Sequence, residues 1–427
     1  MDRDNNTSET NIIFLGGMFP PDSDDWIRQN SIGNIHNAAN VMQWNFIHGL
    51  AHHTGPKLHI ISSPFVGSFP KFFKKMVVPD VHFNAKAGAH GRSIGFLNLP
   101  VVKHYSRYFR LRKPLRDAVQ SSRPPRAMIA YSFTSVMAFS LKRAKLANPS
   151  IVTCLVVADL PGFMNLSAKR SKLSRFLGKM TRKRLYKTLQ HVDCAVLLTE
   201  PMASKMEFAK PYVVIEGISA HKDSTGTDLD LNDTTNRTEN MVVYTGGLNE
   251  AFGVLNLVEA FSTLPDRSLR LVLCGTGDAV PAIEEYAKAD SRIIYRGLLP
   301  HDEVVALQRQ ATVLVNPRQN TGEYVKYSFP SKLMEYMVSG TPTIAYDLDG
   351  IPAEYRDYLF LVPDHEIRSL ASTIQRVLAQ SPAERRWVGQ RARDFVLTQK
   401  NPAVQTEKVL RMIAAILKQR EERYGLV

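Results

Sequence analysis

Short hydrophobic runs alternate with longer amphipathic stretches along most of the chain, and they do so in two blocks. In the first block the runs NIIFLGG, KLHIISS, RAMIAYS, SIVTCLVVADLP and VDCAVLLTE predict buried strands. In the second block the runs MVVYTGG, LRLVLCGTG, RIIYRG, ATVLVNPR, TPTIAY and YLFLV predict strands again. Strands that alternate with helices in this way form parallel sheets covered by helices. The pattern therefore predicts an α/β protein with two Rossmann-like parallel-sheet domains.

A polar stretch separates the two blocks. The segment SAHKDSTGTDLDLNDTTNRTEN has few side chains to bury, which is typical of a linker or a surface loop. We therefore expect a first domain over residues 1–216, a linker over 217–238 and a second domain over 239–400. Residues 401–427 are expected to form a C-terminal helix, whose direction the sequence does not fix.

Glycines and one carboxylate follow the predicted strands. Gly16 and Gly17 come after the first strand, Asp159 ends IVTCLVVAD, and Gly246 and Gly247 end MVVYTGG. Because ligands of open α/β sheets bind beyond the carboxyl ends of the strands, we expect two such edges facing each other across a cleft. The glycine turn would let the backbone approach a phosphate or an acceptor. Asp159 either orients an acceptor hydroxyl and steadies positive charge, or caps the helix that follows it.

Charge is unevenly distributed between the two halves of the chain. Residues 1–215 hold 30 Lys+Arg against 12 Asp+Glu, a net charge of +18, while the other 212 residues hold 24 against 28, a net charge of −4. The first half therefore faces something anionic. No apolar run reaches the roughly 18 residues of a membrane span, and the polar start is unlike a secretory signal. A cytoplasmic protein is expected.

Two basic stretches indicate what the anionic partner is. The segment 166–190 holds nine Lys/Arg and no acid, with an apolar stripe at helical spacing formed by Leu173, Phe176, Leu177 and Met180. Residues 101–116 mix basic and aromatic side chains. Such helices either pack the stripe on their own core and leave a solvated basic face, or lie on an anionic bilayer. We favour peripheral binding to the inner face of the cell membrane.

Metal and redox sites have weak signals. Asp-rich stretches occur at 228–230 and 347–350, and His48 and His52 are four residues apart, but no third ligand is suitably spaced. No metal or other cofactor is therefore expected. The three cysteines lie in apolar runs, which predicts buried thiols in a reducing compartment; they are Cys154, Cys194 and Cys274.

The stretch KYSFPSKLMEYMVSGTPTI carries the strongest chemical signal. It predicts a helix that begins at Ser331 and ends at Gly340, followed by a buried strand from Thr341. The free amides at the start of this helix, with Lys332 beside them, suit a phosphate. Glu335 lies one turn further on, where it could hold a sugar hydroxyl.

The second block resembles the donor-binding domain of retaining family 4 glycosyltransferases of the GT-B fold. The resemblance rests on VVYTGGLNEAFGVLNLVEAF, LVLCGTGD, IIYRGLLPHDEVVALQRQATVLVNPR, YSFPSKLMEYMVSGTPTIAYDLDG and GIPAEY, in that order. The first half resembles the family only loosely, through FLGGMFPP and VVADLPGF.

The resemblance implies a metal-independent transfer of a sugar from a nucleotide donor, UDP-linked, with retention of configuration. It implies that Glu335 binds the donor ribose and that the amides of Ser331 and Lys332 hold the diphosphate. The charge segregation and the basic stretches favour as acceptor a polyprenyl-diphosphate-linked sugar or a saccharide, in the synthesis of exopolysaccharide, capsule or O-antigen. The full set of expected donor-binding residues is Gly17, Gly247, Arg318, Lys326, Tyr327, Ser331, Lys332, Leu333 and Glu335. The expected catalytic residues are Asp159, Arg318 and Lys332.

Two positions depart from the family pattern. Tyr327 stands where the family often has the first Glu of an E-x7-E pair, and either Tyr327 or Glu323 could contact the transferred sugar. Gly247 and Phe252 stand where the family often has an Arg and a Lys. The phosphate charge would then be met by Arg318, Lys326 and Lys332.

These departures keep alternatives open. One alternative is a nucleotide-sugar epimerase of the same fold, and another is a non-catalytic partner that binds a nucleotide sugar or a lipid. Nucleic-acid binding is not expected, because the basic stretches come with no recognisable reading motif.

Overall fold

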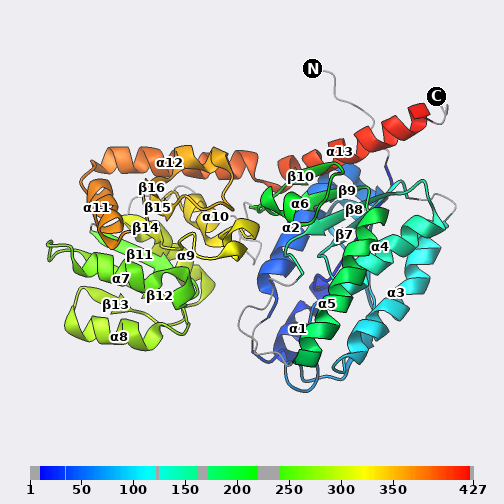
Figure 1. The fold of residues 1–427 in the computed structure, drawn as a ribbon, viewed down its shortest axis with the longest axis horizontal. Coiled ribbons are helices and arrows are strands. Elements are labelled where there is room, and N and C mark those ends of the chain that lie inside the picture. The colour runs from blue at the N-terminus through cyan, green and yellow to red at the C-terminus, as the bar shows by residue number, and fades with distance from the viewer. Residues whose placement is uncertain (1–9, 34, 122–124, 162–171, 220–239, 424–427) are drawn as a thin grey trace. The chain divides into compact units, whose positions relative to one another are not determined.

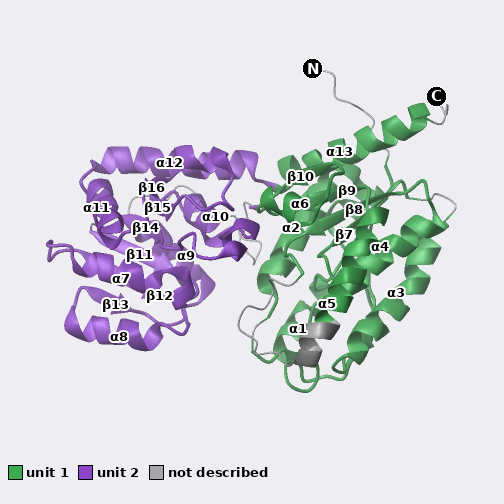
Figure 2. Ribbon diagram, viewed as in Figure 1, with its two compact units in different colours: residues 1–218, 402–427 green, residues 219–401 purple. Residues whose placement is uncertain are grey.

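The computed structural model describes residues 10–33, 35–121, 125–161, 172–219 and 240–423 (Figure 1). The side chains of 172–177 are outside this description. The chain divides into two compact units (Figure 2). Unit 1 comprises residues 1–218 together with 402–427, and unit 2 comprises residues 219–401. The predicted linker lies almost entirely outside the described residues.

The main sheet of unit 1 is parallel except at one edge. Its strand order is β10-β9-β8-β7-β1-β2-β5-β4, and β4 runs antiparallel to β5. Strands β3 and β6 form a separate two-stranded antiparallel sheet. The strands are β1 (Ile12–Gly16), β2 (Leu58–Ser62), β3 (Val77–Val78), β4 (Val81–Asn84), β5 (His90–Ser93), β6 (Phe96–Leu97), β7 (Ala127–Tyr131), β8 (Val152–Val157), β9 (Cys194–Leu197) and β10 (Tyr212–Val214).

The C-terminal helix belongs to unit 1, although it follows unit 2 in the sequence. It packs along α2 and also contacts β8, β9 and β10. At the crossing with α2, a side chain at Gly49 would place its Cβ 2.1 Å from the Pro402 carbonyl oxygen, so the close approach requires glycine. The helices of this unit are α1 (Asp24–Asn30), α2 (Asn37–Thr54), α3 (Val102–Val119), α4 (Ser135–Ala147), α5 (Lys172–Tyr186), α6 (Pro201–Lys205) and α13 (Pro402–Arg423).

Unit 2 holds a fully parallel sheet in the order β13-β12-β11-β14-β15-β16. Its strands are β11 (Met241–Thr245), β12 (Arg270–Cys274), β13 (Ile293–Tyr295), β14 (Val313–Asn316), β15 (Thr343–Tyr346) and β16 (Phe360–Val362). Its helices are α7 (Val254–Ser262), α8 (Val280–Ala289), α9 (His301–Gln310), α10 (Ser331–Val338), α11 (Ile367–Leu378) and α12 (Pro382–Gln399).

The hydrophobic runs are confirmed as strands in both units, and two parallel-sheet α/β units were the predicted fold. The three cysteines are free and buried, as predicted. The strands β3 to β6 and β10 were missed, because they are short and contain exposed or half-buried positions instead of forming a buried apolar run. Within the described part of the chain, no helix has the length and apolar character needed to cross a membrane.

Candidate functional site

The helix α10 follows the loop after β14 in unit 2. Pro330 precedes its first turn in an extended conformation, and among the described residues no side chain caps it. Amides in the first turn of a helix point out of its N-terminus and carry positive partial charge. Ser331 lies exposed at this end. The side chain of Leu333 is fully buried, and its amide donates to the Pro330 carbonyl oxygen at 2.8 Å, so Leu333 contributes to the core.

The Tyr336 hydroxyl fixes α10 to the backbone at the end of β11. The Tyr336 hydroxyl donates to the Thr245 carbonyl oxygen at 2.9 Å and accepts from the Thr245 amide at 2.8 Å. Gln308 of α9 donates to Thr245 Oγ1 at 2.8 Å. Burial raises the pKa of Tyr336 far above its ordinary value, so the hydroxyl stays neutral and can serve both bonds. The sequence did not predict these hydrogen bonds, because Tyr336 occupies what the pattern indicates is one more apolar position of the helix.

Lys332 and Glu335 form an ion pair on the solvent side of α10. Lys332 Nζ lies 2.6 Å from Glu335 Oε2, and the two side chains are 37% and 40% exposed. A Cβ on Gly246 would lie 3.7 Å from Lys332 Cε, which places the lysine beside the glycine turn that follows β11. The pair is therefore accessible to a ligand and lies at the carboxyl edge of the sheet.

Arg318 lies in the loop after β14, held between aromatic rings. Its guanidinium carbon is 5.7 Å from the Phe252 ring centroid and 5.2 Å from that of Tyr324. Arg318 Nη2 donates to Ser328 Oγ at 2.8 Å. Its Nε is buried, and no atom among the described residues accepts a hydrogen bond from it. Burial lowers the pKa of this guanidinium, although Arg318 remains cationic in the physiological range. Phe252, which stands where the resembled family often has a cation, therefore contacts the Arg318 guanidinium with its ring.

The glycines of this edge serve loop packing. A Cβ on Gly275 would lie 1.7 Å from the Gly246 carbonyl oxygen, and one on Gly277 would lie 2.1 Å from that of Leu248. Gly247 accepts a hydrogen bond from the Tyr244 hydroxyl at 2.8 Å. The loops after β11 and β12 therefore lie in backbone contact at the edge that carries Lys332.

The remaining predicted donor residues are paired with neighbours. The Tyr327 hydroxyl donates to Glu323 Oε1 at 3.0 Å, within one turn of 3₁₀ helix. The two alternatives for the sugar contact therefore lie together. Lys326 Nζ lies 3.5 Å from Asp349 Oδ2, and Asn320 donates to the other oxygen of Asp349 at 2.9 Å.

The Asp-rich stretch at 347–350 is engaged by side chains of unit 2. Asp347 pairs with Arg356 at 3.1 Å, and Asp349 pairs with Lys326. Within the part of the chain that the structure describes, no three His, Cys, Asp or Glu side chains are grouped as metal ligands. The second Asp-rich stretch, 228–230, lies outside the described residues.

Gly17 and Asp159 belong to unit 1, at the carboxyl edge of its sheet. A Cβ on Gly17 would lie 2.1 Å from the Phe65 ring, so the turn requires glycine. Asp159 follows β8 and is exposed by surface area, while nearby protein atoms still desolvate its carboxylate and raise its pKa. Its negative charge also contributes to the raised pKa of Tyr131, after burial, which places Asp159 near the end of β7.

The predicted apolar stripe of α5 lies mostly outside the described side chains. Of its members only Met180 is described, and it is 39% exposed. The residues from 178 to 184 are exposed as well, and they include Lys179, Arg182, Lys183 and Arg184.

Comparison with known proteins finds a family match over part of unit 2. Residues 239–380 match the family described as "Glycosyl transferases group 1". The matched segment runs from β11 to α11 and contains Arg318, Lys332 and Glu335. A D-inositol 3-phosphate glycosyltransferase from Corynebacterium glutamicum (strain R) is 32% identical over 123 residues, which cover 26% of this chain and 28% of that protein. The chain matches between 28% and 40% of the length of the four curated relatives.

Solved structures resemble nearly the whole chain. The sucrose-phosphate synthase of Thermosynechococcus elongatus superposes with a TM-score of 0.61 at 17% identity, covering 95% of this chain and 100% of that one. The catalytic domain of starch synthase IV from Arabidopsis thaliana, bound to ADP and acarbose, has a TM-score of 0.60 at 11% identity, covering 95% and 99%. The fold class is therefore GT-B, as predicted.

Proposed function

We propose that this protein is a metal-independent glycosyltransferase that takes a sugar from a UDP-linked donor with retention of configuration. The observation that carries the proposal is the pair Lys332–Glu335 at the N-terminus of α10, inside the segment that matches the group 1 family. Glu335 binds the ribose hydroxyls, and the amides of Ser331 and Lys332 bind the diphosphate.

Arg318 and Lys332 stabilise the leaving group. As the glycosidic bond breaks, negative charge develops on the diphosphate, and preorganised donors at that position are worth about 3 kcal/mol each. The contacts of the Arg318 guanidinium with the Phe252 and Tyr324 rings hold this group in one orientation. Its buried Nε–H has no acceptor among the described residues and is available to a ligand. Such a cluster supplies positive charge without a divalent ion. Lys326 contributes at longer range, because it is half exposed and paired with Asp349.

Glu323 is proposed as the carboxylate that contacts the transferred sugar. Tyr327 occupies the position of the family glutamate, and its hydroxyl holds Glu323 Oε1 at 3.0 Å. The tyrosine would thus position a carboxylate supplied from one turn earlier in the chain. This arrangement favours an active enzyme over a non-catalytic binding partner.

The acceptor is proposed to bind unit 1 near Gly17 and Asp159. It is proposed to be a lipid-linked sugar or a saccharide of surface polysaccharide synthesis. Helix α3 supports a membrane location. Its solvent side begins with exposed Val102, Tyr105 and Phe109 and continues with Lys113 and Arg116. An apolar and basic face of this kind suits an anionic bilayer.

A donor-binding experiment tests the proposal directly. The melting temperature of the protein is measured with UDP, GDP and ADP and with their common sugar derivatives, with and without EDTA. UDP at one hundred times its Kd should stabilise the protein by about 2.7 kcal/mol, and EDTA should not change this. The anomeric configuration of the product, read by NMR, then tests retention. Activity lost in EDTA and restored by manganese, or no response to any nucleotide, would overturn the proposal.

A further inference from the structure

Helix α3 directs a buried arginine into the loop after β2. Arg107 is only 6% exposed, its Nε donates to Ser63 Oγ at 2.9 Å, and its Nη2 donates to the Ser63 carbonyl oxygen. The guanidinium carbon lies 5.2 Å from the Phe65 ring centroid and 5.4 Å from that of Phe96. Ser63 accepts two of the five N–H groups that a guanidinium offers.

A second cation lies one turn earlier on the same face of the helix. Lys103 Nζ donates to the Val66 carbonyl oxygen at 2.8 Å, which occupies one of the three N–H groups of its ammonium. Within the described residues, neither Lys103 nor Arg107 has a carboxylate partner. Two neighbouring cations are thus drawn toward one loop without a compensating charge.

Two histidines lie within electrostatic range of the same two cations, and both are exposed by surface area although nearby protein atoms still desolvate their imidazoles. Burial, and then the charges of Lys103 and Arg107, lower the pKa of His36, and the same causes lower the pKa of His104. Burial and the charge of Arg107 lower the pKa of Lys103 to about 8. Holding the charges of Arg107, which is buried, and Lys103, which is partly buried, close together without a counter-ion is costly, and an anion bound beside them would reduce that cost.

The cluster lies at the edge where an acceptor is expected. The Ser63 amide donates to the Gly16 carbonyl oxygen at 2.9 Å, and the Phe65 amide donates to that of Gly17 at 2.8 Å. The loop that Arg107 and Lys103 hold is therefore bonded directly to the glycine turn after β1. Both strands end at this carboxyl edge, because Gly16 is in register with Ser62.

The N-terminus of α2 faces the same turn. His36 precedes this helix of 18 residues as its N-cap. Asn40 and Gln43, in its first two turns, accept hydrogen bonds from the Phe19 amide at 2.8 Å and from the Gly17 amide at 2.6 Å. The positive end of a long helix therefore adds to the potential of the basic side chains.

We propose that Lys103 and Arg107, flanked by His36 and His104, bind a phosphate group of the acceptor. That the phosphate belongs to an acceptor rests on the proposed function. Phosphate binding itself does not depend on the donor site in unit 2. An arginine fork and a lysine ammonium are the groups that bind a phosphate most strongly. The phosphate would lie beside the glycine turn, where it would hold the acceptor hydroxyl at a fixed position.

Phosphate binding is measured by calorimetry with inorganic phosphate and with glucose 6-phosphate, on the full chain. The Lys103→Met variant should bind at least about 10-fold more weakly, which corresponds to the loss of one charge-assisted hydrogen bond. Lys418→Met removes an exposed lysine of α13 in the same unit and should bind like the wild type. Arg107→Lys, which keeps the charge but loses the fork, should weaken binding without unfolding the protein.

A second readout separates an anion site from a structural clamp. Proton NMR of the imidazoles, assigned with His36→Gln and His104→Gln, should show that phosphate raises the pKa of both histidines. Affinity should also fall as the pH rises through about 8, because Lys103, which faces His36, His104 and Arg107, then loses its proton. If Lys103→Met binds phosphate like Lys418→Met and the histidines do not respond, the cations serve only to hold the loop.

The source of the phosphate is resolved by comparing two ligands. Glucose 6-phosphate is titrated in solution, and neutral phosphatidylcholine vesicles are prepared with and without a polyprenyl phosphate. If only the vesicles with polyprenyl phosphate bind the protein, and Lys103→Met abolishes this binding, the phosphate belongs to a lipid. If glucose 6-phosphate binds instead, the phosphate belongs to a soluble sugar phosphate. Normal UDP binding without phosphate binding would overturn this inference alone. Phosphate binding without UDP binding would overturn the proposed function alone.

Discussion

At the scale of single residues, the Lys332–Glu335 pair connects the two ends of the proposed donor site. In the proposed site, a diphosphate that accepts from Lys332 would draw the ammonium away from Glu335, and the carboxylate would then accept from the ribose hydroxyls. The two residues lie three positions apart on α10, and their nitrogen–oxygen distance is 2.6 Å. The tyrosine clamp beneath them, Tyr336 with Thr245, keeps the helix in place as they exchange partners.

The two residues should affect different kinetic constants. Glu335→Ala should raise the KM for the donor about 10- to 100-fold, since it loses a charged hydrogen bond made in the ground state. Lys332→Met should also lower kcat by about 100-fold, because it acts on charge that grows in the transition state. Glu303→Ala, an exposed carboxylate on α9, is the control. A donor KM unchanged in Glu335→Ala would remove this residue from the ribose site.

At the scale of elements, the sequence was most informative about buried strands and about α10. The helix was expected from Ser331 with a stop at Gly340, and the structure has it over Ser331–Val338 with Gly340 in the left-handed region at φ 71°. Patterns of this kind are local, so they can be read without knowing the fold. The basic cluster around Arg107 was not predicted, because the residues that face it are brought together only by the sheet.

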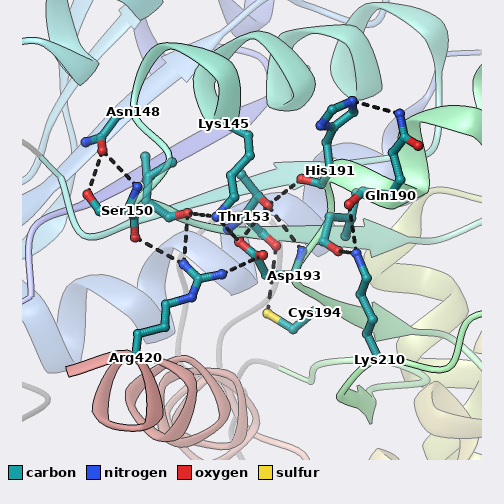
Figure 3. A network of polar contacts seen from close by, with 12 residues as sticks. Lys145, Asn148, Ser150, Thr153, Gln190, His191, Asp193, Cys194, Lys210 and Arg420 are labelled. Atoms are coloured by element: carbon teal, nitrogen blue, oxygen red, sulfur yellow. Dashed lines mark hydrogen bonds and ion pairs between the residues drawn. The ribbon is translucent and has the colours of Figure 1, made fainter. Parts of the chain in front are cut away.

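The docking of α13 on unit 1 was likewise hidden in the sequence. Figure 3 shows Asp193 at the centre of a polar network, between Lys145 and Arg420. Asp193 Oδ2 accepts from Lys145 Nζ and from the Thr153 amide, both at 2.9 Å, and Oδ1 lies 2.6 Å from Arg420 Nη2. Arg420 also donates to the Ser150 carbonyl oxygen at 3.1 Å. The last helix of the chain is thus bound to the start of β8.

Asp193→Asn should destabilise unit 1 by about 2–3 kcal/mol, because it leaves two partly buried cations without their counter-charge. Burial alone would raise the pKa of Asp193, but the bonds from Lys145 and Thr153 and the charge of Arg420 lower it. A lowered carboxylate pKa stabilises the folded state above about pH 4, and the gain is lost as the pH falls below that value.

Urea unfolding at pH 7 and at pH 3 measures this contribution. The difference between wild type and Asp193→Asn should be large at pH 7 and should shrink at pH 3, where the carboxylate is protonated in the unfolded chain and folding has to release that proton. Asp117→Asn, in a surface pair with Arg116 that is 54% exposed on both sides, should have no measurable effect. Equal destabilisation by the two variants would contradict the role given to the network.

At the scale of the whole molecule, the charge is segregated by half, with +18 over residues 1–215 and −4 over the rest. The proposed anion site on the inward face of α3 would account for part of this positive charge. The outward face of the same helix carries a different set, in which exposed Val102, Tyr105 and Phe109 precede Arg112, Lys113 and Arg116. Arg112 lies 5.6 Å from the centroid of the Phe109 ring, so the apolar and basic parts are contiguous.

Reversing charge on this outward face should therefore release the protein from anionic membranes. Near an anionic surface each basic residue contributes about 1 kcal/mol, so Arg112→Glu with Lys113→Glu and Arg116→Glu should reduce vesicle binding more than 100-fold. Sedimentation with vesicles of phosphatidylcholine and phosphatidylglycerol measures this binding. It is done at two salt concentrations, because salt screens the electrostatic attraction. The matched control reverses three exposed arginines of unit 2, Arg267, Arg368 and Arg376. Binding that survives the α3 reversal, or that both triple variants lose equally, would show that net charge and not this face drives the attraction.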